Sequence, residues 1–453
     1  MRIKSSSGVI QKRVLYAKAV FGQEEKDAVL RSLNNGWLAS GPLVNEFEEK
    51  IAELFGKKYG VAVNSGSSAN LLAIHALGIR KGSEVITPAC TFATTVSEII
   101  NNNLVPVFID SVVGRYTIDE DLVERVINPG VTKAILVPQL IGGVCNMEKL
   151  REIADRNDLI LIDDSCDTLA PTFKGKTVAS YADITTTSFY GSHIITTCGM
   201  GGMILTDNSE IAEKIITLRD WGRVGNDLEE FNSRYNFSVN GIPYDAKFLY
   251  TELGYNLKMN EVSAAFGLEQ IKKLPEFIKI RHQNFEELIN FFKRFENWFH
   301  LPYLVEGAQT NWLAFPLCIK EDTPFSRFDF LKHLEEDGIQ TRVIFSGNIL
   351  RHPVYKTNGL WRTASLLDNA DYIMANGLLL GCHQGMGKKE IAIISQSAEK
   401  FLERFNNKIV VSKNLNSNLP TNLKTRKNGK FNVSPEQFTE EMNISSADSV
   451  EIN

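Results

Sequence analysis

The sequence predicts an α/β protein, in which a large, mostly parallel sheet covered by helices precedes a smaller α+β domain. Between about residues 45 and 275, short apolar runs alternate with amphipathic segments, a rhythm typical of parallel strands joined by helices. From about 300 to 405, a few strand-like runs are followed by helical ones. The 453 residues suffice for two or three domains. We divide them into an N-terminal segment (1–45), a large domain (46–280), a small C-terminal domain (281–408) and a flexible polar tail (409–453).

The individual elements follow from the spacing of apolar residues. Residues 43–56 carry apolar side chains three and four positions apart and predict a helix, and residues 256–296 predict a long helical region. Five apolar runs predict strands of the large sheet: 85–92, 105–110, 133–140, 159–165 and 201–207. In the small domain we expect strands at 311–319 and 340–345 and helices at 328–338 and 390–405. The polar stretch after about residue 412 lacks periodicity, which predicts the flexible tail.

Composition excludes several classes of protein. The net charge of −5 argues against a general nucleic-acid binder, which needs a basic surface to neutralise phosphates. The N-terminus lacks the apolar core of a signal peptide, and no apolar run approaches the length of a membrane span, so we expect a cytoplasmic protein without a membrane partner. Six cysteines are scattered without a CxxC pair, which argues against a disulfide framework or a structural zinc site.

A small-residue turn enters an amphipathic helix at residues 64–77. Free amides and the positive helix end would point the same way there, an arrangement that binds phosphate. Ser65, Gly66 and Ser67 would form the cradle. Taken alone, the stretch is more typical of an ordinary helix cap with serine as N-cap.

Two further stretches follow apolar strands. Phe92 could stack on a flat cofactor ring or be a core phenylalanine. Asp163 and Asp164 end a strand, where α/β proteins bind ligands. One of these carboxylates could pair with a protonated pyridine nitrogen, or cap a helix, or lie at the surface. His193 lies in a block rich in Ser, Thr and Gly, and a lone histidine is more often structural than catalytic.

In order, the blocks SGSSAN, TPACTF, IDDSCD, SFYGSH and GYNLKMNEVSAA resemble the DegT/DnrJ/EryC1/StrS family of sugar aminotransferases and dehydratases. The likeness covers roughly residues 15–405. It implies a pyridoxal- or pyridoxamine-phosphate enzyme of the type I (aspartate-aminotransferase-like) fold. It also implies a homodimer whose active site draws on both subunits.

The resemblance assigns roles to particular residues. It implies that Gly66, Ser67 and Ser188 hold the cofactor phosphate, that Phe92 stacks on the ring, and that Asp164 pairs with the pyridine nitrogen. Asp167 takes the place of a glutamine or histidine near the ring. Asn256 matches an asparagine that reaches the partner subunit's cofactor phosphate.

The main departure from the family is at His193. The family pattern S-F-x-x-x-K ends in the lysine that forms a Schiff base with the cofactor, whereas this chain ends the pattern in histidine. Imidazole forms no stable Schiff base, but it moves protons near neutral pH. The pattern resembles the family's 3-dehydratases of 4-keto-6-deoxy nucleotide sugars, which work with pyridoxamine phosphate. His193 would then remove a cofactor proton and help to expel the C3 hydroxyl, and glutamate or another amino acid would restore the amine.

One member of that branch holds an iron–sulfur cluster, but the cysteines here do not match it. Cys166 matches one ligand, while the three cysteines that would follow residues 219–223 are missing, so we expect no cluster and no bound metal. A second departure is the stretch TTCGMGG, which replaces the family's TTGEGG and puts Met200 where an acid is usual.

Substrate contacts and alternative functions stay open at this point. Arg342, Asn348 and Arg351 lie in a stretch that resembles a substrate loop and could bind a nucleotide diphosphate, or could be ordinary surface residues. One alternative is an aminotransferase that uses Lys258 in place of the missing lysine. Another is a non-catalytic protein that binds the cofactor or the sugar.

Overall fold

The computed structural model describes residues 13–225 and 228–416. Residues 1–12 of the predicted N-terminal segment and residues 417–453 of the predicted tail lie outside the described residues. The chain forms two units, residues 1–403 and 404–453. In the second unit, the described residues 404–416 continue the last helix, α13 (Lys388–Asn416).

An eight-stranded sheet forms the centre of the large domain, with strand order β1-β9-β8-β5-β4-β2-β3-β17. The five pairs from β8 to β17 are parallel, whereas β9 runs antiparallel to both of its neighbours. The prediction of a mostly parallel sheet is therefore confirmed. In chain order the strands are β1 (Tyr59–Val63), β2 (Glu84–Pro88), β3 (Val105–Ile109), β4 (Thr132–Pro138), β5 (Ile160–Asp164), β8 (Ile184–Ser188), β9 (Gly202–Thr206) and β17 (Arg362–Thr363).

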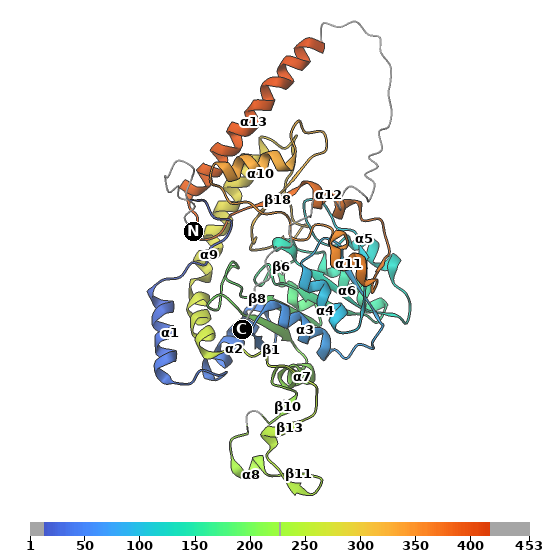
Figure 1. The fold of residues 1–453 in the computed structure, drawn as a ribbon, viewed down its shortest axis with the longest axis vertical. Helices are drawn as coiled ribbons and strands as arrows, with labels where there is room; N and C mark the ends of the chain where they lie inside the picture. Colours follow the sequence, from blue (N-terminus) through green and yellow to red (C-terminus); the bar gives the residue numbers. More distant parts are fainter. Residues whose placement is uncertain (1–12, 226–227, 417–453) are drawn as a thin grey trace, which may run out of the picture. The chain divides into compact units, whose positions relative to one another are not determined.

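Helices bury both faces of this sheet, as Figure 1 shows. The strand alternation of period two sends Ala134 and Leu136 into one core with α3 (Gly66–Ala76) and α7 (Ser209–Arg219). It sends Ile135 and Val137 into a second core with α6 (Met147–Arg156). A third core lies between β1, β9, α2 (Pro42–Phe55) and α9 (Glu261–Lys293). Burial on both faces explains why these strands are apolar throughout.

The C-terminal half is tied to the large sheet at several points. Helix α9 runs without a break across the domain boundary that the sequence predicts at residue 280. A three-stranded antiparallel sheet follows, formed by β14 (Phe299–His300), β16 (Phe315–Ile319) and β18 (Gly377–Leu380), together with α10 (Arg327–Glu336). Between α10 and β18 in the chain, strand β17 pairs with β3 of the large sheet.

Some predicted elements differ from the structure. The predicted strand at 340–345 is wrong, because Arg342 makes only a single bridge to Leu379. The predicted strand at 85–92 ends at Pro88, and α4 (Ala93–Asn101) begins soon after it. Strands β1 and β8 and helix α1 (Gln23–Asn35) were not predicted.

A small arm follows α7. It contains β10 (Arg223–Val224), α8 (Phe231–Arg234), β11 (Ser238–Val239), β12 (Ile242–Pro243) and β13 (Leu249–Tyr250), and it projects away from the sheet in Figure 1. Across the described chain, every helix is too short or too polar to cross a lipid bilayer.

Candidate active site

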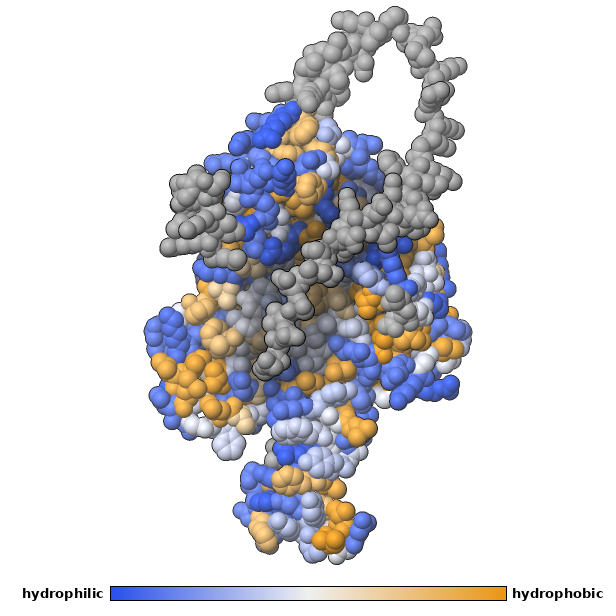
Figure 2. Space-filling view, in the orientation of Figure 1, coloured by the Kyte–Doolittle hydropathy of each residue, from blue (hydrophilic) through white to orange (hydrophobic). Residues whose placement is uncertain are grey.

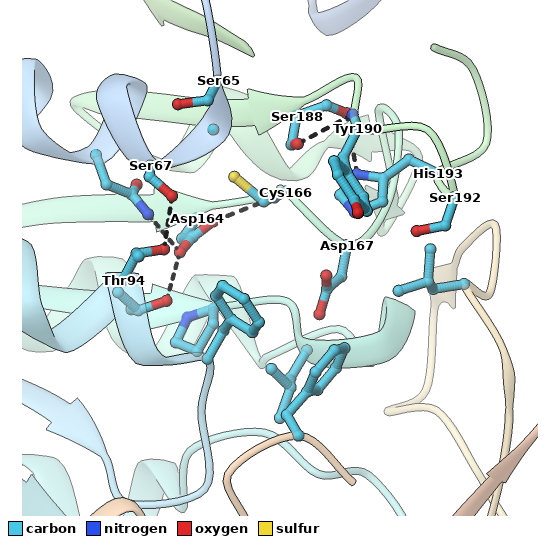
Figure 3. Close-up of a pocket in the computed structure, with 18 of the residues that line it drawn as sticks. Ser65, Ser67, Thr94, Asp164, Cys166, Asp167, Ser188, Tyr190, Ser192 and His193 are labelled. Atoms are coloured by element: carbon cyan, nitrogen blue, oxygen red, sulfur yellow. Dashed lines mark hydrogen bonds between the residues drawn. The ribbon is translucent and has the colours of Figure 1, made fainter. Parts of the chain in front are cut away.

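A cavity of about 360 Å³ opens at the carboxyl ends of β4, β5 and β8. This edge of a parallel sheet is where α/β proteins bind ligands, since loops and helix N-termini converge there. Figure 3 shows the polar residues that line it. The lining combines residues predicted from the sequence (Ser65, Gly66, Ser67, Phe92, Asp164, Asp167, Ser188, His193) with others that were not predicted (Tyr16, Asn70, Thr94, Thr95, Pro138, Leu140, Cys166, Tyr190, Ser192, Met200, Gly201, Leu313, Phe345).

One end of the cavity is the N-terminus of α3. Ser65 is the N-cap, and its Oγ accepts a hydrogen bond of 3.1 Å from the Ser68 amide. The first amides of a helix lack partners within it and carry its positive end, so they can receive an anion. Gly66 lets another segment approach closely, because a Cβ there would lie 2.7 Å from Cβ of Ser188 and 2.9 Å from Sγ of Cys166. Ser65 therefore caps the helix, as one of the two alternatives predicts, and Gly66 and Ser67 line the cavity.

Asp164 is fixed at the end of β5. Its Oδ2 accepts hydrogen bonds from Nδ2 of Asn70 (2.9 Å) and Oγ1 of Thr95 (2.8 Å), and its Oδ1 accepts one from the Cys166 amide (3.2 Å). Asp163, the preceding residue of the strand, points to the opposite face of the sheet and accepts hydrogen bonds from Nε2 of Gln139 and Oγ of Ser165. The structure therefore separates the two acids, and only Asp164 reaches the cavity.

A second carboxyl group, Asp167, also lines the cavity. Its Oδ2 accepts a hydrogen bond of 3.0 Å from the Ile141 amide. Burial, with a smaller contribution from the nearby carboxylate of Asp164, raises the pKa of Asp167 to about 7. The residue is therefore partly protonated near neutral pH.

His193 faces the same cavity from the loop after β8. Its Nδ1 lies 3.2 Å from the Ser188 carbonyl oxygen, which suits the tautomer that donates from Nδ1. In that tautomer Nε2 is left as a proton acceptor. Burial lowers the pKa of His193 to about 4, so the ring is neutral near pH 7. The ring of Tyr190 contacts it edge-on, with 5.9 Å between the ring centroids.

Backbone hydrogen bonds hold the His193 loop closed. The amides of Phe189 and Gly191 donate to the carbonyl oxygens of Gly201 (2.9 Å) and Gly199 (3.0 Å). The TTCGMGG stretch thus folds back on the histidine loop and places Met200, 54% exposed, on the rim of the cavity. Where the family usually has an acid, this rim is apolar.

Phe345 enters the cavity from the C-terminal half. It packs edge-on against Phe92, with ring centroids 5.7 Å apart, and its backbone has a φ of 39°. Such a conformation is strained for a bulky residue and is kept only where surrounding contacts fix it. Here the contacts are hydrogen bonds from Ile349 N to Ala89 O and from Ser346 Oγ to Thr91 O.

The polar residues predicted to bind the substrate do not line the cavity. Asn348 is fully buried, and its Nδ2 donates to Oδ1 of Asp371 (2.8 Å). Arg351 binds the same carboxylate, with Nε 2.8 Å from Oδ1. Arg342 is exposed and lies over the ring of Tyr16, which does line the cavity, with its guanidinium carbon 5.5 Å from the ring centroid.

Two other predicted residues lie outside the cavity lining. Asn256 is exposed and bridges to Asp220 on the segment that leads to the arm. Lys258 is the residue that the aminotransferase alternative puts in place of the missing lysine. Its Nζ lies 3.5 Å from Oδ1 of Asp220 and 3.1 Å from the centroid of the Trp221 ring. No lysine is found among the described residues of the lining.

Comparison with known proteins decides the family. Residues 20–398 match the model of the DegT/DnrJ/EryC1/StrS aminotransferase family. The chain belongs to this family. Within it, the chain is 36% identical over 397 residues to the lipopolysaccharide biosynthesis protein RfbH of Salmonella typhimurium, covering 84% of this chain and 90% of that protein. It is 32% identical over 379 residues to the GDP-4-keto-6-deoxy-D-mannose 3-dehydratase of Escherichia coli O55:H7, covering 81% and 95%.

Solved structures of DegT/DnrJ/EryC1/StrS relatives share the fold. The E. coli GDP-4-keto-6-deoxy-D-mannose 3-dehydratase with bound hydrated pyridoxal phosphate matches with a TM-score of 0.78 at 30% identity, covering 85% of this chain and 100% of that chain. A structure of GDP-4-keto-6-deoxymannose 3-dehydratase with a trapped pyridoxal phosphate–glutamate geminal diamine matches with the same values. The predicted family and type I fold are thus confirmed.

Proposed function

We propose that this chain is a pyridoxamine-phosphate-dependent 3-dehydratase of a nucleotide-linked 4-keto-6-deoxyhexose. Its product would be a 3,6-dideoxy sugar for lipopolysaccharide O-antigen or another glycan, and glutamate or another amino acid would restore the cofactor amine. The observation that carries the proposal is that His193 lines the cavity. The sequence resemblance assigns this position to the family's Schiff-base lysine. The names of the relatives support the substrate class.

The cavity fits a pyridine ring that carries a phosphate. The N-terminus of α3 and the space left by Gly66 suit the phosphate, since a Cβ at this position would fill that space. Asp164, held by three hydrogen-bond donors, suits a protonated ring nitrogen. The half-exposed ring of Phe92 offers an apolar surface for stacking.

Each residue then has a distinct task. When bound, pyridoxamine phosphate supplies an amine for the sugar ketone and an electron-accepting ring. Asp164 keeps the ring nitrogen protonated, because a close negative charge favours the pyridinium. His193, neutral near pH 7, accepts a proton at Nε2 and can return it to the departing C3 hydroxyl.

We also propose a homodimer with shared active sites. Asn256 lies outside the cavity of its own chain and remains available to a partner's cofactor phosphate. Exposed apolar side chains on α1 and on the segments just before and after it offer a surface for association, and Figure 2 shows apolar colour where α1 lies. The apolar residues of this surface are Phe21, Leu30, Leu33, Trp37 and Leu38.

A direct assay tests the function. Purified protein is given pyridoxamine phosphate and 4-keto-6-deoxy sugars linked to CDP, GDP, UDP or dTDP, with and without glutamate, and the products are analysed by mass spectrometry. Loss of one water from the sugar supports the dehydratase, and it should vanish in His193→Asn. Gain of an amino group would instead favour an aminotransferase, and no change with any nucleotide would favour a non-catalytic protein.

A further inference from the structure

Asp167 is an unusual member of the cavity lining because no cation faces it. The other titratable groups of this lining are Asp164 on β5, the Cys166 thiol, the imidazole of His193 and the phenols of Tyr16 and Tyr190. Neither lysine nor arginine occurs among the described residues of this lining. Two carboxylates in one cavity without a cation repel each other, so one of them is favoured in its neutral form.

The hydrogen bonds of the two carboxyl groups indicate which of them is favoured in its neutral form. Three donors stabilise the negative charge of Asp164, whereas Asp167 accepts one hydrogen bond, from the Ile141 amide to Oδ2. The other oxygen, Oδ1, has no protein partner within the described chain. Figure 3 shows the side chain directed into the cavity. A charged Asp167 would therefore be poorly compensated, while a neutral one can use Oδ1 as a donor.

The backbone that meets Asp167 is strained. Ile141 has a φ of 61°, a conformation rarely adopted by β-branched residues. It presents its amide to Asp167, while its carbonyl oxygen accepts a hydrogen bond of 2.8 Å from Leu313, another residue of the cavity lining. Strain of this kind persists where surrounding contacts fix a functional geometry. Here it fixes Oδ2 as the acceptor and leaves Oδ1 for a ligand.

We propose that Asp167 works as a neutral carboxylic acid that donates a hydrogen bond from Oδ1 to an oxygen acceptor of the bound cofactor or sugar. The inference rests on the proposed cofactor and gives this cavity a second proton-bearing group besides His193. It assigns opposite states to two neighbouring acids: Asp164 is charged and accepts, whereas Asp167 is neutral and donates.

Asp167→Asn keeps the shape of the side chain but removes its titratable proton. The asparagine carbonyl oxygen can accept the Ile141 amide, and its amino group can donate to the ligand at any pH. We measure the affinity for pyridoxal phosphate alone by absorbance titration from mildly acidic to mildly alkaline pH. Above about pH 7 the dissociation constant of the native protein should rise up to about tenfold per pH unit relative to that of Asp167→Asn. Asp163→Asn is the matched control, since this acid has a similarly raised pKa but lies outside the lining.

Repeating the titration with a nucleotide sugar present identifies the acceptor. A pH effect with pyridoxal phosphate alone assigns the acceptor to the cofactor, and an effect that needs the sugar assigns it to the sugar. Carbon-13 NMR of labelled aspartate in the full chain, by difference from Asp167→Asn, should place the Asp167 titration near pH 7. Identical pH profiles for the native protein and Asp167→Asn both without and with the nucleotide sugar, or titration of Asp167 near the ordinary aspartate range, would overturn the inference. Neither measurement needs turnover, so failure of the proposed dehydration would be seen separately.

Discussion

At the residue scale, the replacement of a lysine by His193 decides what chemistry the cavity can perform. The imidazole is anchored by Nδ1 at the Ser188 carbonyl, which leaves Nε2 directed to accept a proton rather than to form a covalent bond. The surrounding polar residues keep the arrangement of a cofactor site. Under the proposed function, this substitution would change the reaction within a cavity that is suited to the family's cofactor.

His193→Lys should restore covalent attachment of the cofactor. A lysine at this position begins from the same backbone and has the length to reach the space that the imidazole faces. After borohydride reduction, mass spectrometry should find pyridoxal phosphate bound to the variant and absent from the native chain. Trapping in the native chain would contradict the proposed role of His193.

The lowered pKa of His193 also predicts a pH effect on stability. The pKa falls from 6.5 to about 4 on folding, so the unfolded chain binds more protons between these values. The contribution of the neutral ring is fully present above pH 6.5 and is lost as the pH falls towards 4. Urea unfolding at a series of pH values should show a smaller loss of stability on acidification in His193→Asn than in the native protein. Equal losses would contradict the buried, neutral ring.

At the element scale, the cavity depends on a loop from the C-terminal half. Residues 345–349 are hydrogen-bonded to the segment before α4, and this places Phe345 opposite Phe92. The polar residues of the same stretch are used elsewhere, because Asn348 and Arg351 both bind Asp371. The loop thus contributes an aromatic side chain to the cavity lining, while its polar side chains fix the loop by binding Asp371.

Phe345→Ala and Arg351→Ala should therefore behave differently. Removal of the aromatic side chain should lower kcat/KM at least about tenfold, because a large contact surface for cofactor and sugar is lost. Arg351→Ala should leave KM for the nucleotide sugar within about twofold, since its guanidinium already pairs with Asp371. Steady-state kinetics on both variants checks this. A large rise in KM for Arg351→Ala alone would favour the diphosphate role inferred from sequence.

A site residue can be predicted from the sequence when its position depends on residues nearby in the chain, and not when it depends on distant ones. Asp164 and Gly66 are predictable because each follows directly from a local pattern, a buried strand or a helix start. Strand β8 has the sequence ITTTS, and its threonines, buried in the sheet, give no apolar run. Phe345 was missed because hydrogen bonds to residues about 255 positions earlier fix its position. No local pattern encodes such a contact.

At the scale of the whole molecule, the proposed sharing of active sites between two subunits predicts complementation between two defective variants. His193→Asn lacks the proton acceptor, and Asn256→Ala lacks the proposed contact to the partner's cofactor. In mixed dimers, one of the two sites would combine an intact His193 with an intact Asn256. Random mixing of equal amounts should restore about one quarter of native activity. Activity no greater than that of the separate variants would argue that each chain completes its own site.

The pairing of β17 with β3 has a consequence for synthesis on the ribosome. Residues 362–363 cover the outer edge of a sheet whose other strands are complete by residue 206. While the nascent chain is being extended over the intervening residues, the backbone groups on that edge of β3 stay without their final partner, and an uncovered edge is where one chain pairs wrongly with another. Slowed translation before codon 362 should therefore increase aggregation of this protein more than the same delay placed after it.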